Sequence, residues 1–230
     1  MTFLHQTKLL ILFMILSVAL QAPLALCADP DPLQDFCIAD LAKTSTPING
    51  FPCKPASNVT ASDFIFNGLA VEGNTTSNQF GSKVTPGDVL AFPGLNTLGV
   101  SMNRVDLAPG GLNPPHHHPR ATELDIVVKG EVLVGFISSG NVYFSSVLKE
   151  GQMFVIPKGM IHFQMNVGKE KGLVITTFNS QLPGAVVAPL ALFAANPAVP
   201  NEVLTKTLQV DESVVKLIKS KFAASVGHVY

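Results

Sequence analysis

Charged residues are scarce in this chain, and their balance argues against several classes of partner. Asp, Glu, Lys and Arg make up 13% of the 230 residues, whereas soluble domains average about 25%. The formal net charge is −1 and no run of basic residues occurs, so binding to nucleic acid or to an anionic membrane is not indicated. The low charge is consistent with a protein that buries part of its surface in an oligomer. Internal repeats and signs of a second domain are also lacking.

The N-terminal segment is typical of a secretory signal. A short basic start precedes an apolar run over residues 9–20, and small residues follow at Ala25 and Cys27, the two positions that signal peptidase reads. We therefore expect a signal peptide over residues 1–27, cleavage after Cys27 and secretion to the extracellular space. A membrane anchor, the alternative, is disfavoured because the apolar run is shorter than the roughly 20 residues that a spanning helix needs.

Cysteine is rare, and removal of the signal leaves two of the three cysteines. Cys37 and Cys53 form an even pair in an exported chain, which predicts a disulfide. The closed loop of about 15 residues would stabilise the fold by roughly 3 kcal/mol in the chain-entropy description. Two free buried thiols, the alternative, are unusual in an oxidising compartment.

Asn58 and Asn74 each begin an N-glycosylation motif, which is meaningful because we expect the chain to be exported. Asn74 lies in a polar stretch that we expect to be an exposed loop.

Short apolar runs in the middle of the chain predict an all-β fold. From about residue 84 to residue 180, runs rich in Val, Ile, Leu and Phe alternate with Gly and Pro, a pattern typical of a sandwich or barrel. These runs span residues 98–107, 124–128, 131–137, 142–148, 153–156 and 173–178. We expect a disulfide-tied N-terminal arm over residues 28–80 and the barrel core over residues 81–182, both within one domain of residues 28–230.

The composition changes near residue 183, where we expect a short C-terminal helical extension over residues 183–230. Residues 185–195 are rich in Ala, Val and Leu. A stripe with the spacing of one helical face is formed by Val214, Leu217, Ile218 and Phe222. Asp211 precedes this stripe as a plausible N-cap. An amphipathic helix attached to a closed barrel needs a surface that buries its stripe, and we expect that surface to lie across a subunit boundary.

Two segments carry residue types that bind transition metals. The first contains the triplet His116-His117-His118 and Glu123, and the second contains His162. In an extended chain the side-chain period of two places His116 and His118 on one face and His117 on the other. Three neutral imidazoles and one carboxylate form a credible site for a divalent transition metal.

The spacing within both segments resembles the two conserved motifs of the cupin superfamily and, within it, of the germins and germin-like proteins of plants. The first motif, G-x5-H-x-H-x4-E-x6-G, is matched by Gly110, His116, His118, Glu123 and Gly130. The second motif, G-x5-P-x-G-x2-H-x3-N, is matched by Gly151, Pro157, Gly159, His162 and Asn166. The likeness extends to residues 31–37, 114–115, 119–123 and 204–206.

This resemblance implies a cupin jelly-roll β-barrel, the Cys37–Cys53 disulfide and a hexamer built as a trimer of dimers. It also implies a manganese ion bound by His116, His118, Glu123 and His162. Chemistry alone leaves the metal open, because copper and zinc bind such ligands more tightly than manganese does. Four protein ligands on an octahedral ion leave two positions open, whereas a structural zinc site would be closed and tetrahedral.

The charge of such a centre suggests a class of substrate. A divalent metal with one carboxylate and three neutral imidazoles is positive overall and would attract a small anion such as superoxide or oxalate. Asn103 and Asn113 match the asparagines that germins with oxalate oxidase activity use for oxalate. The alternative is that Asn103 is a satisfied polar group and that Asn113 is a turn residue before Pro114.

We therefore expect a secreted, hydrogen-peroxide-producing manganese oxidoreductase of the plant apoplast or cell wall, with a defence or wall role. Superoxide dismutase and oxalate oxidase are the two activities that the resemblance implies. The alternative is a non-enzymatic extracellular protein, a binding, structural or storage-type cupin whose metal site is structural.

Overall fold

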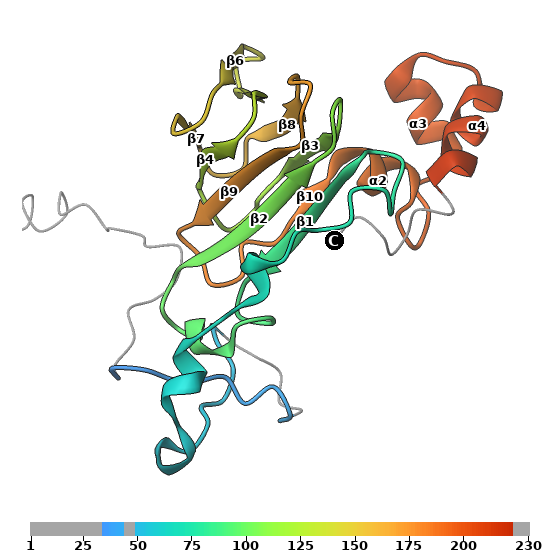
Figure 1. Cartoon of the computed structure of the whole chain (residues 1–230). Coiled ribbons are helices and arrows are strands. Elements are labelled where there is room, and N and C mark those ends of the chain that lie inside the picture. The colour runs from blue at the N-terminus through green and yellow to red at the C-terminus, as the bar shows by residue number, and fades with distance from the viewer. Residues whose placement is uncertain (1–33, 44–48, 223–230) are drawn as a thin grey trace, which may run out of the picture.

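The computed structural model describes residues 34–43 and 49–222. The expected signal peptide over residues 1–27 lies outside the described residues. Within them, two antiparallel β-sheets face each other, an irregular arm extends from one end, and α-helices follow the last strand (Figure 1).

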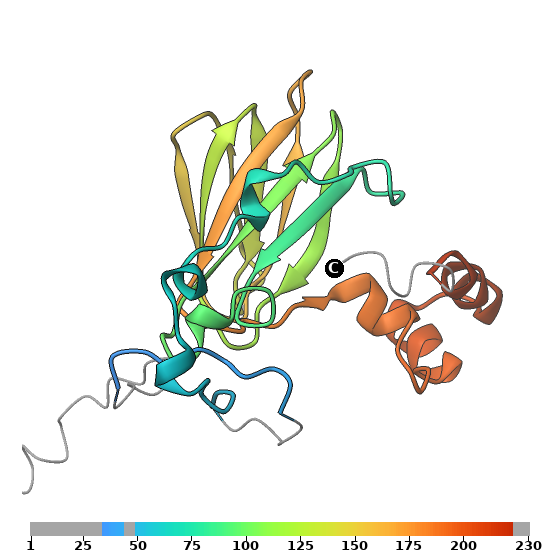
Figure 2. The same ribbon diagram turned by 60° about the horizontal axis from the view of Figure 1, so that its bottom comes forward.

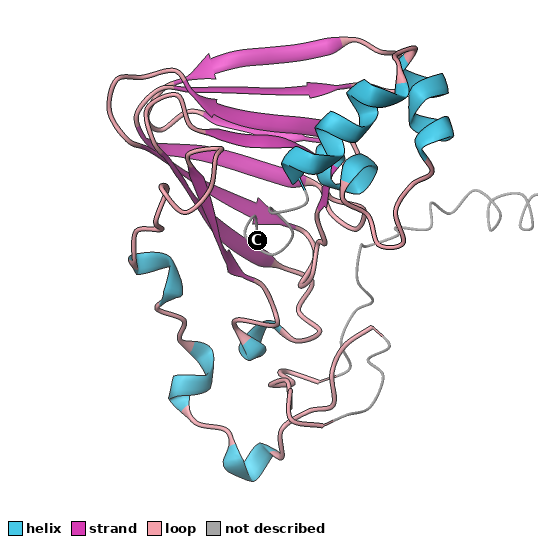
Figure 3. Ribbon diagram, turned by 90° about the vertical axis from the view of Figure 1, so that its right-hand side faces the viewer, coloured by secondary structure: helices cyan, strands magenta, loops and turns pink. Residues whose placement is uncertain are grey.

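Each sheet contains five strands (Figure 3). In the first sheet the order is β1 (Ser82–Gly87), β2 (Ser101–Leu107), β9 (Gly172–Phe178), β4 (Glu123–Lys129) and β7 (Met153–Ile156). In the second sheet the order is β10 (Val186–Val187), β3 (Leu112–His117), β8 (Ile161–Asn166), β5 (Val132–Ile137) and β6 (Tyr143–Leu148). Most strands that follow each other along the chain lie in different sheets, so the chain repeatedly crosses between the layers as in a jelly roll.

Strand β9 shows why these residues form a half-buried sheet. Val174, Thr176 and Phe178 are buried, whereas Ile175 and Thr177 between them are partly exposed, as the side-chain period of two requires. The inward-facing side chains of both sheets form a core that consists of Val84, Val105, Leu107, Val127, Val132, Val134, Leu148, Ile156 and Val174. Most of these residues are β-branched, and β-branched side chains pack well on a pleated surface. The jelly-roll fold predicted from the sequence is confirmed.

The turn between β4 and β5 shows where glycine is required. Gly130 has a φ of +89°, and a Cβ atom there would lie 3.2 Å from the Cα of Gly172. The left-handed conformation and the close approach both disfavour a larger residue. Gly130 thereby allows the chain to leave one sheet and enter the other within a short turn.

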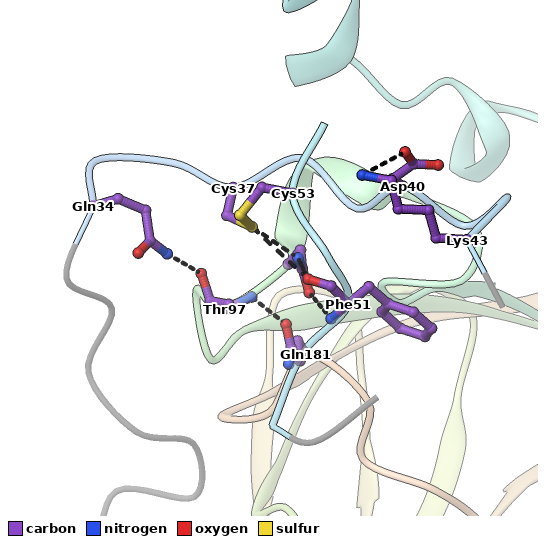
Figure 4. The surroundings of a disulfide bond; sticks show 9 residues. Gln34, Cys37, Asp40, Lys43, Phe51, Cys53, Thr97 and Gln181 are labelled. Atoms are coloured by element: carbon purple, nitrogen blue, oxygen red, sulfur yellow. Dashed lines mark hydrogen bonds and ion pairs between the residues drawn. A yellow bond between two sulfur atoms is a disulfide. The ribbon is translucent and has the colours of Figure 1, made fainter. Parts of the chain in front are cut away.

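The N-terminal arm is closed into a loop by a disulfide within it, and one buried asparagine fastens this loop to the rest of the chain. Cys37 and Cys53 form the disulfide (Figure 4). Asn96 is fully buried, accepts a hydrogen bond from the N–H of Phe51 and donates one to the carbonyl oxygen of Phe51, both at 2.9 Å. Its amide also lies 3.2 Å from the Sγ atom of Cys37. One side chain therefore connects the disulfide loop to the chain just before β2.

The rest of the arm consists of turns and short 3-10 helices. These helices are η1 (Ala56–Asn58), η2 (Ala61–Phe64) and η3 (Gly68–Ala70), and η4 (Pro93–Leu95) lies between β1 and β2. A reciprocal capping box between Thr60 and Asp63 begins η2. The candidate glycosylation residues Asn58 and Asn74 are both exposed, as a glycan acceptor must be.

The C-terminal helices extend from one side of the barrel (Figures 1 and 2). They are α2 (Ala188–Phe193), α3 (Asn201–Leu208) and α4 (Glu212–Phe222). The carbonyl oxygen of Asp211 accepts a hydrogen bond from the N–H of Val214 at 3.0 Å, so α4 begins where the sequence predicts. Val215 is buried, but Val214 and Leu217 of the predicted stripe are 40% and 57% exposed. The stripe is only partly covered within one chain. Among the described residues, no helix is long and apolar enough to cross a bilayer.

Replacing Asn96 by alanine should loosen the arm and lower stability. The change removes the hydrogen bonds to both backbone groups of Phe51, and a buried group left unpaired costs about 1–3 kcal/mol. The urea midpoint, measured at a fixed protein concentration, should fall clearly. The exposed control Gln79→Ala should stay within about 0.5 kcal/mol of the unchanged protein. Equal midpoints for the two variants would show that Asn96 does not fasten the arm.

Candidate metal centre

The four predicted ligands come from both sheets and meet inside the barrel. His116 lies in β3 and pairs with His162 of the neighbouring strand β8. His118 directly follows β3, and Glu123 begins β4 of the opposite sheet. These four side chains are between 1% and 5% exposed. His117 does not belong to the cluster, in agreement with the alternation predicted for the triplet.

The ligand atoms lie close enough together to hold a single ion. One candidate atom from each of the four residues lies within 4.8 Å of all the others. The Oε2 atom of Glu123 is 2.9 Å from Nε2 of His118 and 2.8 Å from Nε2 of His162. The ring centroids of His116 and His162 are 4.1 Å apart. In the described part of the chain, no other group of His, Cys, Asp or Glu side chains converges in this way.

The Nδ1 atom of each imidazole contacts a backbone carbonyl oxygen. The pairs are His116 with Pro114 at 2.8 Å, His162 with Met160 at 2.9 Å, and His118 with Gly184. Because a carbonyl oxygen only accepts, each Nδ1 carries a proton, and a neutral imidazole then presents a lone pair at Nε2. The Nε2 lone pairs of His118 and His162 repel the carboxylate of Glu123 at these distances unless a proton or a metal ion lies between them. The donor set therefore fits a divalent transition metal.

The pKa shifts within the cluster also indicate that positive charge is favoured beside Glu123. Burial, assisted by the nearby His162, lowers the pKa of His116 to about 3. Burial raises the pKa of Glu123, but its contacts with His118 and His162 outweigh burial and hold that pKa well below its usual value. Burial lowers the pKa of His162, yet the Glu123 carboxylate outweighs this effect, so that pKa is raised. The carboxylate of Glu123 therefore favours positive charge beside it, which a bound metal ion would supply.

Comparison with known proteins identifies the family. The sequence profile of the cupin family matches residues 67–216. Germin-like protein subfamily T member 2 of Arabidopsis thaliana is 58% identical over 199 residues, which cover 86% of this chain and 89% of that protein. The chain belongs to the germin family of plant cupins. Oxalate oxidase 2 of Hordeum vulgare is 55% identical over 211 residues, which cover 90% of this chain and 94% of that protein.

Solved structures of this germin-type fold agree with the sequence comparison. A structure of oxalate oxidase in complex with the substrate analogue glycolate has a TM-score of 0.83 and 54% identity, and the match covers 85% of this chain and 98% of that one. Peruvianin-I, a cysteine peptidase from Thevetia peruviana latex, has a TM-score of 0.66 and 40% identity over 70% of this chain and 98% of that one. The fold therefore supports more than one chemistry. In this germin-family chain the two described cysteines are joined in a disulfide, whereas the cluster of three histidines and one glutamate implies a metal cofactor.

A buried polar network behind Glu123 was missed by the sequence analysis. Gln164 is fully buried, and its Nε2 donates to Oε1 of Glu123 at 3.0 Å and to Oδ2 of Asp125 at 2.9 Å. Its Oε1 accepts a hydrogen bond from Nδ2 of Asn113 at 2.7 Å. Burial, and then the charge on Glu123, raise the pKa of Asp125 well above its usual value. The sequence could have indicated Asp125 and Gln164. Asp125 follows Glu123 by two positions and Gln164 follows His162 by two positions, so each shares the inward face of its strand with a predicted ligand.

The structure brings both candidate substrate residues to the site, in unequal positions. Asn103 and Asn113 are buried and line the same small cavity beside His116, His118 and Glu123. Asn103 also lines a second, outer cavity of about 240 Å³, together with His118 and residues 182–185. The Oδ1 atom of Asn103 accepts a hydrogen bond from the N–H of Gly87 at 3.3 Å. Asn103 therefore lies between the outer cavity and the ligands, whereas the amide of Asn113 is engaged with Gln164.

Replacing His162 by alanine should abolish tight metal binding, because it removes one of four converging donor atoms. The loss of affinity should exceed the roughly 10- to 100-fold that removal of an outer partner of a ligand costs. His117→Ala is the matched control, since it removes a histidine from the same triplet that stays outside the cluster. Metal content after dialysis, measured by elemental analysis, should drop for His162→Ala only. An equal drop in both variants would argue against the proposed ligand set.

Proposed function

We propose that this protein is a secreted, manganese-dependent oxidoreductase of the plant apoplast or cell wall that produces hydrogen peroxide. The carrying observation is the buried donor set, in which three imidazole lone pairs face one carboxylate. This set occurs in a chain that is 54–58% identical to germin-like proteins and oxalate oxidases over most of its length. A signal peptide over residues 1–27, glycans at Asn74 and Asn58, and a role in defence or in the wall belong to the same proposal.

Manganese is the proposed metal, held by His116, His118, Glu123 and His162. Tighter binding of copper or zinc is expected from the ligand types alone, so the choice of manganese follows the resemblance to germins. When bound, the ion would supply one-electron redox chemistry and a net positive charge. The protein's own contribution is to hold the imidazoles neutral, through their Nδ1 hydrogen bonds, and to restrict access to the site.

Oxalate and superoxide are the proposed substrates, because both are small anions. Oxidation of oxalate by O₂ with two protons gives two CO₂ and one hydrogen peroxide, and dismutation of two superoxide ions with two protons gives O₂ and hydrogen peroxide. Asn103 lines both the small cavity beside the ligands and the outer cavity, so its amide is the better candidate for direct contact with a carboxylate. Asn113 acts through Gln164, which donates to the ligand Glu123.

Asn103→Ala should separate the two activities. A hydrogen bond to a charged group contributes about 1.5–3 kcal/mol, so kcat/KM for oxalate-dependent peroxide formation should fall by roughly 10- to 150-fold. Superoxide dismutation should change little, because superoxide offers no carboxylate. Asn113→Ala provides the comparison and should mainly weaken metal binding. A manganese-loaded, folded protein that is inactive in both assays would overturn the enzymatic proposal and favour a binding or storage role.

A homo-hexamer, assembled as a trimer of dimers, is the proposed quaternary structure. Apolar side chains on the outer faces of both sheets are more than a third exposed in the single chain, among them Met102, Val128, Met153, Val155, Ile137, Ile161 and Met165. An apolar groove of about 760 Å³ also lies on the first sheet, beside Phe66 of the arm and Phe92 of the segment between β1 and β2. Exposed apolar surface of this extent marks an interface, and the half-covered stripe of α4 would be buried in the same assembly.

The double variant Met153→Glu and Val155→Glu should reduce the assembly. Both residues lie on the outer face of the edge strand β7 and are 54% and 55% exposed. The new charges should therefore change the stability of a monomer little and weaken an interface strongly. Light scattering coupled to size exclusion should give a smaller mass than for the unchanged protein. Lys158→Glu, a charge change outside this strand, is the control. A monomeric unchanged protein would rule out the hexamer.

A further inference from the structure

The three imidazoles of the cluster are oriented in two different ways. His116 and His162 each donate from Nδ1 to the carbonyl oxygen two residues earlier in the chain, at Pro114 and Met160. These contacts are local and form whenever the strand forms. His118 instead donates to the carbonyl oxygen of Gly184, which is 66 residues away in sequence. The orientation of His118 therefore depends on a distant segment, residues 182–184, which we name the strap.

The strap is held in place by Arg120, two residues after His118. The backbone N–H of Arg120 donates to the carbonyl oxygen of Pro183 at 3.3 Å, and its Nε donates to that of Leu182 at 2.7 Å. The guanidinium group also lies against Gly184. A Cβ atom there would be 2.7 Å from one terminal nitrogen of Arg120 and 3.1 Å from its Cζ. Gly184 has a φ of +68°, so conformation and close contact both favour glycine.

These contacts form a closed circuit around one ligand. Arg120 fixes the backbone of Leu182 and Pro183. The next carbonyl oxygen along the strap, that of Gly184, accepts the hydrogen bond from Nδ1 of His118. In the chain, a single residue separates His118 from Arg120. On either side, the strap continues into segments bound to the barrel: Ser101 donates to the carbonyl oxygen of Ser180 at 2.7 Å, and β10 pairs with β3. The strap also forms a wall of the outer cavity.

We propose that Arg120 is a positioning residue of the metal centre. By holding the strap, it places the carbonyl oxygen of Gly184, which sets the tautomer and the ring plane of His118 and so directs Nε2 towards Glu123. This inference rests on the metal binding proposed above and assigns a function to an exposed side chain outside the ligand set. An arginine suits the task, because its planar group donates from Nε while its Cζ and terminal nitrogens lie beside the glycine.

Arg120→Gln tests the proposal, with the chain's other arginine as the matched control. Arg104 makes more contacts than Arg120: it binds both carboxylate oxygens of Asp106 at 2.8 Å and the carbonyl oxygen of Leu69 at 3.1 Å. Arg104→Gln therefore removes at least as much local structure without touching the strap. We expect Arg120→Gln to weaken binding of Zn²⁺ and of Mn²⁺ by about tenfold or more, the cost typical of losing an outer partner of a ligand. Arg104→Gln should bind both metals as the unchanged protein does.

A spectroscopic measurement and a conservative variant separate positioning from general destabilisation. The electron paramagnetic resonance spectrum of bound Mn²⁺ should change in Arg120→Gln and stay unchanged in Arg104→Gln. Arg120→Lys keeps a donor for Leu182 but lacks the guanidinium group that lies beside Gly184, so it should recover part of the affinity. It also serves as the test variant if Arg120→Gln fails to fold. Unchanged affinity and spectrum in the folded Arg120 variants, or an equal loss in Arg104→Gln, would overturn the proposal.

Measuring the binding of both Zn²⁺ and Mn²⁺ separates the test of Arg120 from the test of the proposed manganese enzyme. A protein that binds Zn²⁺ but not Mn²⁺ would contradict the manganese enzyme, while the zinc affinities would still decide the role of Arg120. A protein that binds neither metal would overturn both.

Discussion

The barrel must hold three imidazole lone pairs and one carboxylate together in a buried space, and the rest of the structure depends on this constraint. A buried polar group without a partner is costly, and here the donor atoms lie within 4.8 Å of one another. Two sheets share the ligands, so the site forms only when the sandwich closes. The imidazole protons point away, to backbone carbonyls, and the lone pairs point inward. A metal ion that binds this arrangement binds the folded state only and therefore stabilises it.

The network behind the ligands sets the charge of the centre. Gln164 is held in one orientation, because its Nε2 faces two carboxyl groups and its Oε1 accepts from Asn113. Burial and the nearby charge of Glu123 raise the pKa of Asp125, which favours its neutral form. With Asp125 neutral, the site would contain one ionised carboxylate rather than two. With a divalent metal it stays positive, whereas a second buried carboxylate charge would cancel the attraction for an anion.

The sequence predicts those parts of the site that follow from local geometry. The period of two separates His117 from its two neighbours, and the runs of Val, Ile and Leu predict the all-β fold. The same period extends to Asp125 and Gln164, which a stricter use of the rule would have included. The contact between Gly184 and His118 is different, because no local pattern links residues 66 positions apart in sequence. Strand order is likewise set by packing of the two sheets and not by any one strand.

The side chains that line the outer cavity would act on an anion that approaches the ligands through it. Among the described residues that line the outer cavity, Asp88 is the one carboxylate, and no Lys or Arg is present. An anion that approached a metal ion bound at the proposed site would be attracted by the centre and repelled by the Asp88 carboxylate. Coulomb energy scales with the product of the charges, so a dianion would be repelled by Asp88, and attracted by the positive centre, twice as strongly as a monoanion at the same distances. The strap lines the same cavity, so the shape of the cavity and the orientation of His118 depend on the same three residues.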